Sequence, residues 1–471
     1  MLFFYNFDII KVLKRYFSMS INEKQYNFLR TEYSEFVFES YSYEKTPAGL
    51  NIQFHFHVDN KFHFYPKTKI DFQEMKFSKE VKQGELDNLA FNIGLIELIS
   101  YWKCICPARI LIKPHKLDEN QIVFWKKLWF HGLGEFFYIN SIDTDIENFV
   151  TITSFGEKLS SFHFTTELEK TLVPVGGGKD SPVTMELVSS SGQKIIPLII
   201  NPRGATINTV KQFGLSDRNF VLINREIDAK LLELNSLGFL NGHTPFSAML
   251  AFYTLLVSRF LSVSDIALSN ESSANESTVL GTAINHQYSK SYEFESDFRN
   301  YYKSYISEDF NYFSFLRPLS ELQIAALFSQ MVKYHSVFRS CNVGSKEDIW
   351  CGHCSKCLFA YIILSPFLSP AYLSEIFGGN FYDDEKMEIY FKELTGETKV
   401  KPFECVGTVD EVNMAVSLAI EKFYGKNDNL PYLLRNYKKN KISKNVLKSW
   451  NNEHFLLSKY EKTLKDVCGI K

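Results

Sequence analysis

The segment from residue 172 to residue 182 combines residue types that could bind a phosphate group. It reads Leu-Val-Pro-Val-Gly-Gly-Gly-Lys-Asp-Ser-Pro. Glycines have no Cβ atom, so the amides of Gly176, Gly177 and Gly178 can approach and surround an anion. Ser181 and Pro182 predict the N-cap and first turn of a helix, whose dipole would point at that anion. The segment therefore predicts a phosphate cradle, with a nucleotide as its ligand.

A second cluster contains half of the eight cysteines of the chain. Cys341, Cys351, Cys354 and Cys357 follow the spacing C-x9-C-x2-C-x2-C. Four thiolates at this spacing can enclose one zinc ion, and such a site has no open position, so it would be structural. An iron–sulfur cluster could use the same ligands. The clustering indicates metal binding in a reducing cytosol, because disulfides are rare there.

Polar residues also follow two predicted strands of an α/β region. Between about residues 170 and 340, short apolar segments (195–200, 220–224 and 265–268) alternate with helical ones (205–213 and 245–261). Ligands of a parallel sheet collect where its strands end. Asn201 and Arg203 at one strand end are therefore candidate cofactor-binding residues, and Asn270 and Glu271 at another are candidate substrate-binding residues.

Three regions are predicted along the chain. Residues 1–168 are predicted to form a β-rich α+β domain, with strands at 50–57 and 61–65 and a helix at 86–102. Residues 169–375 are predicted to form the α/β nucleotide-binding domain, which includes the cysteine site. Residues 376–471 are predicted to form a mixed, mainly helical appendage. His55, His57 and His63 alternate with aromatics, which favours half-buried strand histidines over a metal site. Met19 is an alternative start to Met1.

The composition is that of a globular, water-soluble protein. The 471 residues are 45% hydrophobic and 23% charged, with a formal net charge of −2, which gives no reason to expect nucleic acid as a partner. The most apolar segment, residues 247–263, is interrupted by Arg259, and no signal-peptide core is found. We expect a cytoplasmic protein without a membrane partner, and the sequence leaves its oligomeric state open.

The glycine segment resembles the PP-loop of the ATP pyrophosphatases, whose pattern is Ser-Gly-Gly-x-Asp-Ser. Gly176 stands where that family usually has serine. The glycine segment followed by the cysteine set is similar to the 7-cyano-7-deazaguanine synthases. These resemblances imply a parallel-sheet PP-loop core of the adenine nucleotide α hydrolase-like fold, which cleaves ATP between the α- and β-phosphates.

A wider resemblance extends from about residue 130 to residue 407. Its motifs, in order, are Gly132–Phe136, Val173–Ser181, Leu240–Pro245, Ala267–Glu271, Asn285–Ser291, Leu316–Glu321, Phe338–Cys341, Trp350–Cys354 and Lys401–Gly407. Together they resemble the MurL-type epimerases of bacterial peptidoglycan synthesis. The resemblance implies inversion of the terminal L-glutamate of UDP-N-acetylmuramoyl-L-alanyl-L-glutamate through an acyl-adenylate. It implies ATP and Mg²⁺ as cofactors, with AMP and pyrophosphate as products.

Residue roles follow from these motifs. The phosphates would contact the three glycines and Ser181, with Lys179 and Asp180 beside them and Asp180 positioning Mg²⁺. The candidates for proton transfer are His243, His286 and Cys405. The candidates for binding the diphosphate or carboxylates of the substrate are Lys290, Arg317 and Arg339.

Two other functions stay open at this point. One is another adenylating PP-loop enzyme, which forms an amide or a nitrile. The other is a zinc-stabilised nucleotide-binding module without catalysis.

Overall fold

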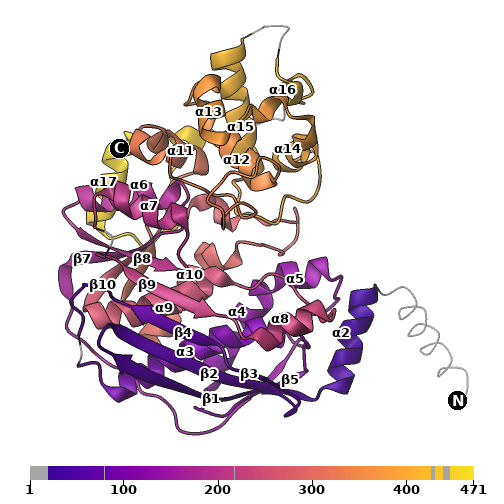
Figure 1. Ribbon diagram of the computed structural model, residues 1–471, viewed down its shortest axis with the longest axis vertical. Coiled ribbons are helices and arrows are strands. Elements are labelled where there is room, and N and C mark those ends of the chain that lie inside the picture. The colour runs from indigo at the N-terminus through magenta and orange to yellow at the C-terminus, as the bar shows by residue number, and fades with distance from the viewer. Residues whose placement is uncertain (1–19, 79, 217, 426–429, 439–445, 471) are drawn as a thin grey trace, which may run out of the picture.

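One mixed sheet forms the centre of the protein (Figure 1). The computed structural model describes residues 20–78, 80–216, 218–425, 430–438 and 446–470, so the alternative starts Met1 and Met19 lie outside the described residues. The strand order is β11-β10-β7-β8-β9-β4-β2-β1-β5-β6, with β3 paired to β2. The strands are β1 (Glu35–Thr46), β2 (Gly49–Val58), β3 (Phe62–Phe64), β4 (Lys67–Asp71), β5 (Arg109–Ile112), β6 (Thr151–Ser154), β7 (Glu167–Pro174), β8 (Lys194–Ile200), β9 (Val221–Glu226), β10 (Val263–Leu268) and β11 (Asn311–Ser314). The predicted mixed α/β architecture is confirmed.

The five strands β7 to β11 form a parallel half-sheet. In chain order they lie as 3-2-1-4-5, because β8 and β9 follow β7 on one side while β10 and β11 lie on its other side. The direction of winding therefore reverses between β7 and β10. In doubly wound sheets, ligands bind in the crevice outside the carboxyl ends of the strands at such a reversal. The predicted strands at 195–200, 220–224 and 265–268 are confirmed as β8, β9 and β10.

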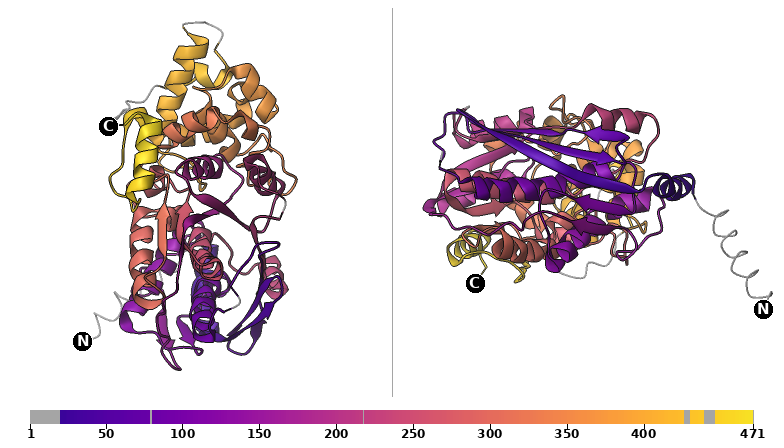
Figure 2. Two further views of the ribbon diagram at one scale, coloured as in Figure 1. Left: turned by 90° about the vertical axis from the view of Figure 1, so that its left-hand side faces the viewer. Right: turned by 90° about the horizontal axis from the view of Figure 1, so that it is seen from below.

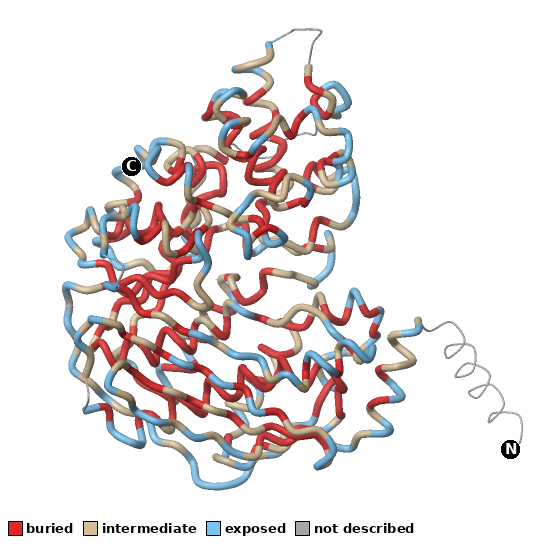
Figure 3. Tube along the Cα trace, in the orientation of Figure 1, coloured by how far each residue is buried: buried red, intermediate tan, exposed pale blue. Residues whose placement is uncertain are grey.

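Helices cover both faces of the sheet, which separates two apolar cores. Figure 3 shows that the buried segments lie in the interior of the protein. Leu172 of β7 belongs to one core and its neighbour Val173 to the other, as the alternation of side chains along a strand requires. The first core contains residues of α3 (Gln83–Trp102), α4 (Glu119–Gly132), α9 (Phe246–Leu261) and α10 (Tyr292–Tyr305). The second contains residues of α6 (Asp180–Ser190) and α7 (Gly204–Phe213). The predicted helices at 86–102, 205–213 and 245–261 are thus present.

The two predicted helix N-caps were placed wrongly. Helix α6 begins at Asp180 with Lys179 at its N-cap, and not after Ser181, because the turn that follows β7, with Gly177 at φ +79°, leads into the helix earlier than predicted. Helix α9 begins at Phe246 with Pro245 at its N-cap, one residue later than predicted from Thr244. The errors are small, yet the first one frees the Ser181 hydroxyl from capping.

The sheet is continuous across the predicted boundary at residue 168. Strand β4 pairs antiparallel with β9, so residues of the predicted N-terminal region extend the parallel half-sheet. Strands β2 and β1 continue it antiparallel, and β5 and β6 add parallel strands at the far edge. The helices of this part are α2 (Ile21–Glu32), α5 (Gly134–Ile139) and α8 (Ala229–Ser236), besides α3 and α4.

The C-terminal part is helical and lies beyond the carboxyl ends of the parallel strands (Figure 1). Its helices are α11 (Glu321–Ser329), α12 (Ser355–Leu364), α13 (Pro370–Phe377), α14 (Glu388–Thr395), α15 (Val409–Ala419), α16 (Tyr432–Arg435) and α17 (Ser458–Cys468). Helix α17 returns to the sheet beside α6 (Figure 2), where the Tyr460 hydroxyl donates to Asp265 Oδ2 at 2.8 Å. Among the described helices, none has the length and apolar composition needed to cross a membrane.

A buried ion pair ties the N-terminal helix α3 to the parallel half-sheet. Arg225 of β9 donates from Nε to Glu97 Oε2 at 2.7 Å and from Nη2 to Oε1 at 2.6 Å, and the Glu97 side chain is 1% exposed. We expect Glu97→Gln to lower the free energy of unfolding by about 3–5 kcal/mol, because it leaves the guanidinium buried without a countercharge. Urea denaturation measures this.

The matched control is Glu74→Gln, which removes a carboxylate that pairs with Arg218 at the surface. Its effect should stay below about 1 kcal/mol. Equal effects of the two substitutions would contradict the role given to the buried pair.

Candidate active site

A cavity of about 530 Å³ lies outside the carboxyl ends of β7, β8 and β10, where the strand order reverses. The predicted site residues that line it are Gly176, Gly178, Asp180, Ser181, Asn201, Arg203, Asn270, Lys290, Arg339, Cys341 and Cys405. A recess of about 40 Å³ shares several of these residues and adds Lys179, Glu271 and Glu321, while Lys356 lines both the cavity and the recess. The structure therefore brings together most residues that the sequence singled out.

The glycine loop is shaped to receive a ligand. A Cβ on Gly177 would lie 2.9 Å from the Ala205 Cβ of α7, whereas nothing lies within 4 Å of a Cβ on Gly176. The hydroxyl of Ser181 is buried and has no hydrogen-bond partner, although the residue lines the cavity. A buried hydroxyl without a partner is costly, and a phosphate oxygen at this position would satisfy it.

Buried charges form the wall beneath the glycine loop. The Lys179 ammonium lies 2.5 Å from Asp180 Oδ1 and also pairs with Glu321, the first residue of α11. Burial favours the neutral amine, but the two carboxylates outweigh it and raise the pKa of Lys179. Burial, together with the charges of Asp180 and Glu271, raises the pKa of Glu321 to about 8, and Lys179 offsets this only in part.

Asp180, Glu271 and Glu321 form a possible cation site. Their carboxylate oxygens lie within 4.8 Å of one another. Carboxylates are the ligands that Mg²⁺ prefers. The donor set fits a magnesium ion that bridges protein and phosphate oxygens, provided that the Lys179 ammonium moves aside.

The three candidates for proton transfer lie close together, and of these Cys405 lines the cavity. The rings of His243 and His286 are 4.3 Å apart, and His286 hydrogen-bonds Glu135, a residue of α5, and lies beside Cys405. Burial opposes protonation of His286, but Cys405 and Glu135 raise its pKa to about 9. Burial, His286 and Lys103 lower the pKa of His243 to about 3. At neutral pH one imidazole is therefore charged and its neighbour is neutral.

Cys405 lies among cations. Lys290 lines the cavity and the recess beside it, and the Lys356 ammonium donates to the Cys405 carbonyl oxygen. Burial favours the thiol, but Lys290, Lys356 and His286 together hold the pKa of Cys405 well below its usual range. The side chain is thus a thiolate that lines both the cavity and the recess.

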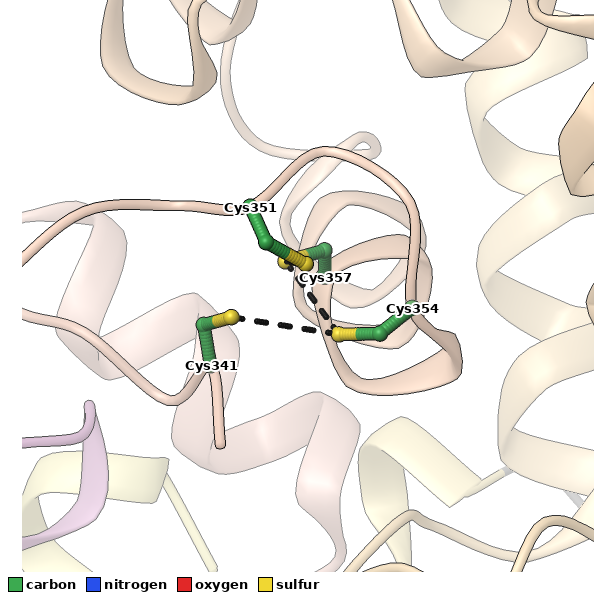
Figure 4. Close-up of side chains that lie close together, drawn as sticks. All are labelled: Cys341, Cys351, Cys354 and Cys357. Atoms are coloured by element: carbon green, nitrogen blue, oxygen red, sulfur yellow. Dashed lines mark hydrogen bonds between the residues drawn. The ribbon is translucent and has the colours of Figure 1, made fainter. Parts of the chain in front are cut away.

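The four clustered cysteines converge as predicted (Figure 4). Their sulfur atoms are separated by 3.9 Å (Cys341–Cys354), 3.7 Å (Cys351–Cys357) and 3.5 Å (Cys354–Cys357). About 3.8 Å is expected between thiolates held at about 2.3 Å around a tetrahedral ion. These separations are far longer than the roughly 2 Å of a disulfide, so the geometry fits a zinc ion.

The cysteine centre adjoins the cavity wall. The backbone N–H of Arg339, two residues before Cys341, donates to the carbonyl of Gly177 at 2.8 Å. Lys356, between Cys354 and Cys357, carries the ammonium that binds the Cys405 carbonyl. A bound ion would therefore hold the glycine loop and the Cys405 segment in place.

One predicted substrate ligand was assigned wrongly. Arg317 is 0% exposed and does not line the cavity, because its guanidinium is used inside the protein. It donates to the carbonyl of Glu271 at 2.7 Å and also to that of Lys290, and it pairs with Glu295 at 3.1 Å. Arg317 therefore positions two site residues and does not contact substrate.

The remaining predicted residues have mixed roles. Asn201 adopts φ +48° and accepts a hydrogen bond from the Arg225 N–H, so it shapes the end of β8, while Arg203 is exposed at the cavity. Asn270 donates to the Ser314 hydroxyl at 3.0 Å. His55 and His63 hydrogen-bond each other at 3.0 Å, and His57 contacts Glu39, as strand histidines.

Sequence reasoning missed Glu135, Glu321 and Lys356 as site residues. Glu135 and Glu321 are part of motifs already noted, Gly132–Phe136 and Leu316–Glu321, and both lie in the first turn of a helix. Lys356 stands between two metal-ligand candidates, and that position was the available signal.

Comparison with known proteins identifies the family. The family model described as the MurL N-terminal domain matches residues 27–315, and the MurL C-terminal domain matches residues 334–444. The chain belongs to the MurL family. No solved structure matches it significantly.

Three curated relatives of this MurL protein have the name UDP-N-acetyl-alpha-D-muramoyl-L-alanyl-L-glutamate epimerase. The protein from a Micromonospora species is 33% identical over 330 residues, covering 69% of this chain and 73% of that protein. The protein from Salinispora tropica is 33% identical, covering 70% of this chain and 72% of that protein. The protein from Xanthomonas oryzae pv. oryzae is 32% identical, covering 71% of this chain and 75% of that protein.

The cysteine centre gives a direct prediction. Replacing Cys354 by Ser should release one zinc ion per chain and lower the melting temperature by roughly 5 °C or more, because metal binding at such a site contributes to folding. Elemental analysis and thermal unfolding measure the two effects. Cys468→Ser, in α17, is the control that should retain both. Metal-free protein with unchanged stability would contradict the assignment.

Proposed function

We propose that this MurL-family protein is an ATP-dependent epimerase that converts the terminal L-glutamate of UDP-N-acetylmuramoyl-L-alanyl-L-glutamate to D-glutamate, a step in the synthesis of peptidoglycan precursors. The names of its relatives support the epimerisation and the substrate. One observation supports the use of a nucleotide: the unpartnered Ser181 hydroxyl and the open glycine loop face a cavity at the reversal of strand order.

The chemistry explains why ATP is needed. The α-proton of a glutamate carboxylate is very weakly acidic, because its removal places a second negative charge beside the first. Transfer of the carboxylate to AMP removes the first charge and lets the carbanion delocalise as an enolate. Water then releases the epimerised product and AMP, and loss of pyrophosphate drives the sequence.

The phosphate end of the cavity would activate the carboxylate. In this proposal the glycine loop is a PP-loop that binds the leaving phosphates with Ser181, while Arg203 at the α7 N-terminus supplies a cation. Asp180, Glu271 and Glu321 would hold Mg²⁺, which offsets charge that develops on phosphate oxygens. Lys290 and Arg339 line the same cavity and are placed to bind the carboxylates or the diphosphate of the substrate.

The two histidines next to Cys405 would supply the groups for proton transfer. His286 is a charged imidazole and can donate a proton, whereas His243 is neutral beside it. Acid and base on opposite faces of the α-carbon would invert the centre. None of the described cysteines forms a disulfide, and we place the enzyme in the cytoplasm, where cysteines stay reduced.

The first test is turnover in D₂O. Purified protein with Mg-ATP and UDP-N-acetylmuramoyl-L-alanyl-L-glutamate should form AMP, pyrophosphate and a D-glutamyl product that carries deuterium at the α-carbon. Mass spectrometry and chiral analysis measure these products. AMP without α-deuterium would instead indicate an amide- or nitrile-forming adenylation, and no AMP at all would contradict the use of ATP.

A second test concerns Ser181. Replacing it by Ala should raise the KM for ATP about tenfold, because the phosphates lose one hydrogen bond to a charged group, worth about 1.5 kcal/mol. Ser190→Ala at the far end of α6 is the matched control and should leave the KM unchanged, since its hydroxyl donates only to the Leu187 carbonyl. Equal KM values for the two variants would remove Ser181 from ATP binding.

A further inference from the structure

Three side chains from distant parts of the chain form a carboxylate–imidazole–thiolate series. Glu135 lies in the first turn of α5, His286 precedes a short 3₁₀ helix (Tyr288–Lys290), and Cys405 precedes α15. The His286 Nδ1 atom hydrogen-bonds Glu135 Oε2, and the same ring lies beside Cys405 and acts on its ionisation. A nucleophile in contact with an imidazole that a carboxylate orients is the arrangement used in covalent catalysis.

Cys405 lines the cavity, and its sulfur is stabilised as an anion. Cys405 lines both the main cavity and the recess, beside Lys290, Lys356 and Asp180. The charged groups that influence it are Lys290, Lys356 and His286, with Glu404 as the adjacent carboxylate. The cations Lys290, Lys356 and His286 keep the thiolate form, although the carboxyl groups of Asp180, Glu135 and Glu404 also lie nearby.

Such a thiolate is better suited to bond formation than to proton abstraction. Stabilisation of an anion lowers its strength as a base, and a general base works best with a pKa near the ambient pH. A thiolate remains a good nucleophile under these conditions, and it is also a good leaving group.

We propose that Cys405 captures the activated glutamyl group as a thioester, and that the α-carbon is epimerised in this covalent state. The inference rests on the ATP-dependent function proposed above and adds a covalent step to it. Glu135 is a positioning residue in this scheme, since it acts through His286.

The step balances as follows. The Cys405 thiolate attacks the carbonyl carbon of the acyl-adenylate, a C–S bond forms, and the C–O bond to AMP breaks, so AMP leaves with the electron pair. One α-proton is removed and another is returned on the opposite face. Water then attacks the thioester carbonyl, the C–S bond breaks, and the thiolate is regenerated together with the D-glutamyl carboxylate and one proton.

The covalent state would help the chemistry in two ways. Sulfur overlaps weakly with the carbonyl group, so the α-proton of a thioester is more acidic than that of an oxygen ester. The bond also retains the substrate beside His243 and His286 after AMP has left, which preserves the orientation needed for proton return.

The experiment compares wild-type protein with Cys405→Ala in D₂O, with pyrophosphate, AMP and α-deuterium measured in one acid-quenched time course. The variant should still release about one pyrophosphate per chain in the first turnover, because adenylation does not involve the sulfur. Release of AMP and incorporation of α-deuterium should both fall by roughly a thousandfold or more. Cys468→Ala, a cysteine outside the cavity, should behave as wild type.

Other outcomes separate the two proposals. AMP release at the wild-type rate without α-deuterium would overturn the thioester and make Cys405 a proton carrier. Retained α-deuterium would overturn any role of the sulfur. Wild-type protein that forms no pyrophosphate would contradict the proposed function itself, before the covalent step is reached.

A second measurement does not depend on the folding of a variant. Wild-type protein quenched in acid during turnover should carry, on the peptide that contains Cys405, a mass equal to the substrate less one water, removable by hydroxylamine. An unmodified peptide throughout turnover would contradict the proposal.

Glu135→Gln tests the positioning role of Glu135. The substitution should shift the pH dependence of the alkylation of Cys405 by iodoacetamide to higher pH, because His286 loses the carboxylate that favours its charged form.

Discussion

Pairing of buried charges in the cavity wall is the constraint on which the site depends. Lys179 stands at the end of the glycine loop and pairs with Asp180 beside it and with Glu321 at the start of α11. A charge buried without a partner would be prohibitively unfavourable, so the loop and α11 must approach each other. Glu411 of α15 joins them by accepting the Glu321 N–H at 2.8 Å. The sheet and the helical C-terminal part are thereby fixed relative to each other around the cavity.

The cysteine centre provides a second connection between the same parts. It lies between the Arg339 N–H, which holds the Gly177 carbonyl, and Lys356, which holds the Cys405 carbonyl. A closed four-thiolate site adds no reactive group of its own. Its contribution is positional, because it spans the phosphate end of the cavity and the Cys405 end within a short stretch of chain.

The sequence predicted features that depend on neighbouring residues. The glycine loop, the cysteine spacing and the strands β8, β9 and β10 follow from local patterns, and the structure contains them. Features that depend on distant packing were not predictable. Nothing near Arg317 in the sequence indicates that Glu271, Lys290 and Glu295 would enclose its guanidinium. The pairing of β4 with β9 likewise joins strands about 150 residues apart, without a local signal.

Lys290 connects the two ends of the site electrostatically. Burial favours its neutral form, yet the Cys405 thiolate and the Glu271 and Asp180 carboxylates raise its pKa. The same ammonium thus balances the carboxylates beneath the glycine loop and the sulfur of Cys405. Burial of these anions side by side without a cation between them would be costly. Lys290 is therefore the charge that allows the two ends of the site to share one recess.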